Sequence, residues 1–140
     1  MKSPAQQDAE HAWHILVGLV MDTRGDWKRK VTEATGLSFS RVRALKRLKD
    51  APRTLSDLAY EMGTDAPAAT VIINDLEARG LVERQAHPEN RRAKLVSLTA
   101  EGRKVIAVVR RIVDQPPPAL AGLPEQDLAQ LRRIVEKMAN

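Results

Sequence analysis

Apolar residues recur every three or four positions along most of this chain, a spacing that predicts amphipathic helices. The first pattern covers residues 8–31 and predicts one long helix, whose apolar positions are Trp13, Leu16, Val17, Val20, Met21, Trp27 and Val31. Five further helices are predicted over residues 38–50, 54–62, 65–79, 99–115 and 125–138. We therefore expect a mainly helical fold with about six helices.

Capping residues mark the starts of several predicted helices. Ser38 or Ser40 is expected to cap the second helix, Thr54 the third, Thr64 or Asp65 the fourth, and Thr99 the fifth. Gly63 supplies a tight turn between the third and fourth helices. Pro116, Pro117 and Pro118 end the fifth helix, because proline cannot continue one.

Two segments, residues 81–86 and 93–98, alternate apolar and polar positions and predict a small β-hairpin with a polar tip at residues 87–92. Two short helices joined by a tight turn and followed by such a hairpin form a winged helix-turn-helix. We interpret residues 1–140 as a single domain. Residues 37–99 form its DNA-binding lobe, and residues 8–36 and 100–139 form its dimerisation helices.

The apolar faces of the terminal helices predict self-association. The last helix is expected to bury Leu128, Leu131, Ile134, Val135 and Met138. A terminal helix in a chain of 140 residues cannot cover so wide a face without a partner. A homodimer with twofold symmetry would match a palindromic DNA site.

The fourth predicted helix has an apolar face and an opposite face of candidate base contacts. Its buried positions are expected to be Ala69, Ile72, Ile73 and Leu76. The candidate base contacts are Pro67, Ala68, Thr70, Val71 and Asn74. Asn can pair bidentately with adenine and Val can pack on a thymine methyl group, which predicts a preference for A·T pairs. The alternative is that these are ordinary surface residues.

The hairpin tip carries the candidate wing contacts, which are Asn90, Arg91, Arg92 and Lys94. Arg side chains are favoured in a narrow minor groove. Phosphate contacts are expected from Lys94, from the basic outer face of the second helix, and from Ser38, Ser40, Arg41, Arg53 and Thr54. Phosphate contacts set affinity rather than sequence choice. The alternative is that the tip is a solvated hairpin end.

Composition narrows the function classes. The chain has 23 Lys and Arg against 18 Asp and Glu, a net charge of +5, which suits a polyanionic partner. Aromatic residues make up 3%, too few for the stacking platforms that bind single strands, so double-stranded DNA is the expected partner. The absence of cysteine excludes disulfides and thiolate metal sites.

The sequence shows few signs of a metal site, a catalytic site or a membrane segment. His11 and His14 lie three residues apart, but the sequence offers no third ligand, so we predict no metal and no cofactor. There is no nucleophile–base pair and no phosphate-binding glycine loop, so we predict no enzymatic activity. No apolar stretch is long enough to span a membrane and no signal peptide is visible. We expect a cytoplasmic, nucleoid-associated protein.

Three stretches resemble the MarR family of bacterial transcriptional regulators: residues 55–59, 70–84 and 87–102. The likeness covers residues 37–113, and its most specific part is the wing followed by Leu98-Thr99-x-x-Gly102. The resemblance implies an obligate dimer built by the first, fifth and sixth helices, with two winged lobes on a palindrome. It also implies an effector cavity for a small aromatic or phenolic anion, for which Trp13, Met21 and Trp27 are candidates. The alternative is that they are core residues, which apolar side chains at helical spacing more often are.

The chain departs from the family pattern at several positions. Val71 and Asp75 stand where the family often has Arg, and Asn90 stands where it commonly has Asp. The leading hypothesis is a ligand-responsive repressor that binds a specific operator as a homodimer. The alternative is a non-specific architectural or partner-binding protein with the same fold. It is motivated by the acidic recognition helix, where Asp65, Asp75 and Glu77 are expected to face only Arg79.

Overall fold

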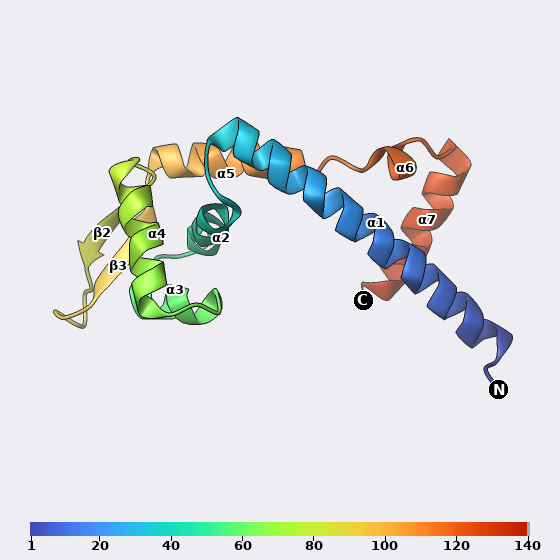
Figure 1. Ribbon diagram of the computed structural model, residues 1–140, viewed down its shortest axis with the longest axis horizontal. Helices are drawn as coiled ribbons and strands as arrows, with labels where there is room; N and C mark the ends of the chain where they lie inside the picture. The colour runs from blue at the N-terminus through green and yellow to red at the C-terminus, as the bar shows by residue number, and fades with distance from the viewer. Residues whose placement is uncertain (140) are drawn as a thin grey trace.

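The computed structural model describes residues 1–139, which form seven helices and a three-stranded sheet. The elements in chain order are α1 (Pro4–Thr35), α2 (Phe39–Leu48), β1 (Arg53–Thr54), α3 (Leu55–Glu61), α4 (Ala66–Ala78), β2 (Val82–Ala86), β3 (Lys94–Leu98), α5 (Ala100–Val113), α6 (Pro118–Ala121) and α7 (Glu125–Met138). Figure 1 shows a lobe of α2, α3, α4 and the sheet at one end, from which α1 extends to the other end, where α7 crosses it.

Caps set the helix boundaries largely as predicted. The Asp65 side chain accepts a hydrogen bond from the Ala68 amide at 2.7 Å, and the Thr54 side chain accepts one from Asp57 at 3.1 Å. The predicted start of α1 was too late, because Ser3 and Gln6 form a capping box that begins the helix at Pro4. The expected cap of α2 was wrong in detail. Ser38 occupies the N-cap position without a side-chain cap bond, and Ser40 lies inside the helix.

The sheet has the order β1-β3-β2, and both pairings are antiparallel. The wing strands pair from Val82 with Leu98 to Ala86 with Lys94, which confirms the predicted hairpin. The third strand, β1, was not predicted. It pairs Arg53 with Val96, and two residues are too few to show a period-two pattern.

The core lies within the lobe and where α1 and α5 join it. Fully buried side chains come from seven elements and include Val31, Val42, Leu45, Leu58, Ile73, Leu76, Val82, Val96 and Val109. Ile72 is only half-buried, whereas the other three predicted positions of the α4 core face are buried. No residue of α7 is buried within the described chain, so the expected burial of its apolar face was wrong for a single copy.

A close approach between α5 and the wing explains the Leu-Thr-x-x-Gly sequence. The Thr99 hydroxyl donates to the Gly80 carbonyl at 2.6 Å and accepts from the Gly102 amide at 3.1 Å. A Cβ atom added at Gly102 would collide with the Leu81 carbonyl oxygen, a backbone atom that cannot turn away. Thr99 and Gly102 therefore fix the wing against α5.

The prolines after α5 lead into α6, a four-residue helix that was not predicted. The last predicted helix, residues 125–138, coincides with α7. None of the helices in residues 1–139 combines the length and apolarity needed to cross a bilayer.

Candidate nucleic-acid interface

The helix-turn-helix is formed by α3 and α4. Gly63 adopts φ +63°, a left-handed conformation that glycine tolerates and that turns the chain sharply between the two helices. The exposed face of α4 carries Pro67, Val71 and Asn74, and Val71 is 61% exposed. Ala68 and Thr70 are half-buried, and the Thr70 hydroxyl donates to the Ala66 carbonyl at 2.9 Å. All five candidate base contacts therefore lie on α4, with three of them on its open face.

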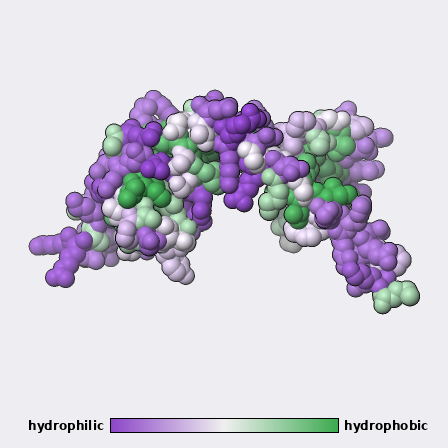
Figure 2. Space-filling view, in the orientation of Figure 1, coloured by the Kyte–Doolittle hydropathy of each residue, from purple (hydrophilic) through white to green (hydrophobic). Residues whose placement is uncertain are grey.

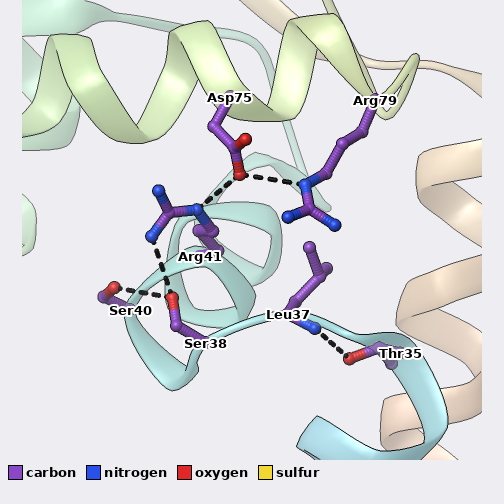
Figure 3. Close-up of polar contacts among 7 residues, drawn as sticks. All are labelled: Thr35, Leu37, Ser38, Ser40, Arg41, Asp75 and Arg79. Carbon is purple, nitrogen blue, oxygen red and sulfur yellow. Dashed lines mark hydrogen bonds and ion pairs between the residues drawn. The ribbon is translucent and has the colours of Figure 1, made fainter.

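Asp75 lies on the side of α4 that faces α2, between two arginines (Figure 3). Its Oδ2 accepts hydrogen bonds from Arg41 Nε at 2.6 Å and from Arg79 Nε at 2.9 Å. The hydrogen bond from Arg41, with smaller contributions from Arg79, lowers the pKa of Asp75 below its ordinary value of 3.8, although partial desolvation opposes the shift. Asp75 is therefore an ionised carboxylate at the centre of an ion-pair cluster with Arg41 and Arg79.

The remaining acidic groups of α4 are also engaged. Glu77 accepts a hydrogen bond from Arg84 Nη1 of β2 at 3.0 Å, and Asp65 caps the helix. The expectation that Asp65, Asp75 and Glu77 face only Arg79 was wrong, because Arg41 of α2 and Arg84 of β2 also pair with these carboxylates. Sequence spacing along one helix cannot reveal such partners.

A network of side chain to backbone hydrogen bonds shapes the wing tip. His87 Nδ1 accepts from the backbone amides of Glu89 at 3.0 Å and Asn90 at 3.2 Å. Asn90 Oδ1 accepts from the Arg92 amide at 3.1 Å, so a neutral Asn organises the tip without a carboxylate. The role of His87 was not predicted from the sequence, although a side-chain acceptor just before Pro88 is a turn signal.

A hollow of about 260 Å³ lies between the start of α3 and the wing. Its lining residues are Thr54, Leu55, Ser56, Asn90, Arg92, Ala93 and Lys94. The structure thus brings one predicted phosphate contact, Thr54, together with three predicted wing contacts. It adds Ser56, whose exposed hydroxyl was missed because the sequence does not show how near α3 lies to the wing.

Comparison with known proteins finds a family that this chain resembles. The chain matches the MarR family over residues 35–93, the segment from the end of α1 to the wing tip. The transcriptional regulator HosA of Escherichia coli O111:H- is 28% identical over 130 residues, which covers 92% of this chain and 95% of HosA. The lobe of this chain is thus similar to the MarR family. The resemblance seen in the sequence is confirmed.

Two further relatives support the assignment. The HTH-type transcriptional regulator YdgJ of Bacillus subtilis is 38% identical over 78 residues, or 55% of this chain, and the match spans only 48% of YdgJ. The solved structure of a mutant of S. aureus MepR bound to an oligodeoxyribonucleotide superposes with a TM-score of 0.73 at 19% identity, covering 91% of this chain and 95% of MepR. The chain therefore has the fold of these DNA-binding proteins and is similar in sequence to transcriptional regulators of the MarR family.

The other predicted phosphate contacts of this chain lie apart from that hollow or are already paired. Arg41 bonds to Asp75 and, through Nη1, to Ser38 Oγ at 3.1 Å, which itself lies 3.1 Å from Ser40 Oγ (Figure 3). Arg53 pairs with Glu61 at 3.2 Å. These two arginines hold elements of the lobe together.

The three candidate effector residues do not line one pocket. Trp27 lines a cavity of about 350 Å³ between α1, α6 and α7. Trp13 and Met21 are 68% and 58% exposed and are not among the residues that line it. His11 and His14 are exposed on α1, and within residues 1–139 no three His, Cys, Asp or Glu side chains gather in a way that could hold a metal ion.

Proposed function

We propose that this protein binds double-stranded DNA in a sequence-specific manner as a homodimer on a palindromic operator, and that it is a ligand-responsive repressor. One observation carries the DNA-binding proposal: the open face of α4 and the cationic hollow beside the wing belong to one lobe with a shared core. An α-helix fits the major groove, and Arg92 and Lys94 would then lie near the adjacent backbone or minor groove.

Charge supports this placement. The carboxylates of Asp75 and Glu77 are paired with Arg41, Arg79 and Arg84, so their negative charges are offset by neighbouring cations. Arg91 and Arg92 project from the wing, where both are exposed. The DNA-facing surface would therefore be apolar and amide-bearing on α4 and cationic on the wing.

The homodimer is supported by the apolar surface of the terminal helices. Large apolar side chains are exposed on α1 and α7, namely Trp13, Ile15, Leu16, Val20, Met21, Ile134, Val135 and Met138. Figure 2 shows apolar residues gathered at the end of the molecule where α7 crosses α1. Such a patch is unusual on a monomer, and a second copy of the chain would bury it in a dimer interface. Twofold pairing there would place two wings on one face of DNA.

A hollow where α2 meets α5 suits an effector of the predicted class. Its volume is about 290 Å³, and its lining combines Lys46, Lys49, Ile106 and Val113 with Arg110 and Asp114, which pair with each other at 3.4 Å, so two lysines remain as its unpaired cations within the described residues. Cationic groups around an apolar floor would suit a small aromatic anion. Because the hollow joins the lobe to a helix of the proposed dimer interface, a ligand there would change the spacing of the two wings.

The test is selection of bound duplexes from a random pool at near-physiological salt, with wild type, Arg92→Ala and, as a control, Arg29→Ala on α1. The expected result is enrichment of a palindrome, to which Arg92→Ala binds more weakly than wild type and Arg29→Ala binds equally well. Uniform binding to all sequences would instead favour the architectural alternative. Placing the selected site at a reporter promoter tests repression, and a rise in expression would contradict it.

A further inference from the structure

Asn74, in the middle of the exposed face of α4, has a fixed side-chain partner. Arg84 Nη2 donates a hydrogen bond to Asn74 Oδ1 at 2.6 Å. Guanidinium groups only donate, so the amide atom that faces Arg84 must be the oxygen and not the nitrogen. The chemistry of the pair thus settles the orientation of the amide.

Arg84 is itself held firmly. It lies in β2, opposite Val96 of β3, and its side chain is 19% exposed. Its Nη1 bonds Glu77 Oε1 at 3.0 Å while Nη2 bonds Asn74, so one guanidinium contacts two side chains of α4. A charge-assisted bond of this kind is stronger than one between neutral groups. The wing strand therefore holds the Asn74 oxygen toward the protein.

We propose that Arg84 is a positioning residue for base specificity, because it makes Asn74 present its NH₂ group to DNA. This inference rests on the proposed sequence-specific binding. Adenine offers one acceptor and one donor in the major groove, and a free Asn matches both, whereas guanine offers two acceptors and thymine one. An Asn whose oxygen is engaged therefore favours guanine or thymine over adenine at the base that it contacts.

The experiment measures base preference at each operator position by selection and competition binding for four proteins. In Asn74→Asp, one carboxylate oxygen keeps the bond to Arg84 and the other accepts a bond from DNA. The base preferred at one position of each half-site should change to cytosine or adenine, which present donors. In Arg84→Met, the Asn74 side chain loses its partner and can bind adenine through both its oxygen and its NH₂ group. The preference for guanine or thymine over adenine should therefore fall about tenfold.

Arg79→Met is the matched control, because it removes the same charge from the far end of α4 without touching Asn74. It should leave the base preference unchanged, and thermal unfolding of each variant shows whether its fold persists. If Asn74→Asp and Arg84→Met select the same operator bases as wild type, the proposed role of Arg84 is wrong, whereas the proposed sequence-specific binding still stands. A wild type that enriches no sequence would overturn the proposed function and this inference with it.

Discussion

Arg41 Nε in α2 lies 2.6 Å from Asp75 Oδ2 in α4, which ties the recognition helix to the helix behind it. The same carboxylate oxygen accepts from Arg79, and Arg41 also reaches Ser38 at the start of α2. Both side chains of the pair are about one-quarter to one-third exposed, so solvent screens the pair only in part. Asp75 thus serves the packing of α4 against α2.

Replacing Asp75 with Asn should destabilise the lobe, because Arg41 and Arg79 would lose the charge that they share. Urea unfolding followed by circular dichroism should show a lower midpoint for Asp75→Asn than for wild type. Asp8→Asn, at an exposed position of α1, is the control and should unfold like wild type. Equal midpoints for all three proteins would show that the cluster contributes nothing to stability.

Stability should depend on pH through Asp75. Its pKa is lowered in the folded chain, so its contribution is complete above the ordinary value of 3.8 and is lost as the pH falls through the lower, folded value. The difference in unfolding midpoint between wild type and Asp75→Asn should stay constant from pH 7 to pH 5 and shrink below pH 4. A difference that persists unchanged at pH 3 would contradict this assignment.

Gly102→Ala should destabilise the protein by about 2 kcal/mol or more, because the new methyl group forces α5 away from the wing. Gly25→Ala is a matched control within α1, where nothing lies near the added carbon. That variant should be about 0.5–1 kcal/mol more stable than wild type, since alanine favours helix. Denaturant unfolding measures both, and a neutral Gly102→Ala would refute the close approach of Gly102 to Leu81.

Arg92 and Lys94 should act chiefly through phosphate charge. Each substitution by Ala should weaken binding to all sequences alike and should reduce the slope of log affinity against log salt concentration by about 1. Binding measured from 50 to 200 mM salt gives the slope. A change in sequence preference with an unaltered slope would instead indicate that the side chain contacts a base edge.

The apolar end of the molecule should determine the oligomeric state. Val135→Glu places a charge on the exposed apolar face of α7, beside Leu131 in the cavity lining, and should convert a dimer into monomers. Gln130→Glu adds the same charge to α7 outside that lining and should leave the dimer intact. Sedimentation velocity distinguishes monomers from dimers. If Val135→Glu remains a dimer, the dimer interface lies elsewhere on the protein.

The sequence by itself determined the order and the ends of most elements. Periodicity, Asp65, Thr99 and the prolines act on residues close by in the chain, so the helix-turn-helix, the hairpin and α7 could all be predicted. The same local rules identified which residues lie on α4 and on the wing tip. They failed for β1, whose two residues pair only because β3 lies beside them.

Only the tertiary structure decided where the charged and amide groups point. Asp75 meets Arg41 across 34 residues, and Asn74 meets Arg84 across 10, because α2, α4 and β2 pack around one core. It also showed that Thr54 lies beside Arg92, whereas Trp13 and Trp27 do not share a pocket. Hydrogen bonds depend on positions in space to within a fraction of an ångström, and spacing along a sequence does not contain that information.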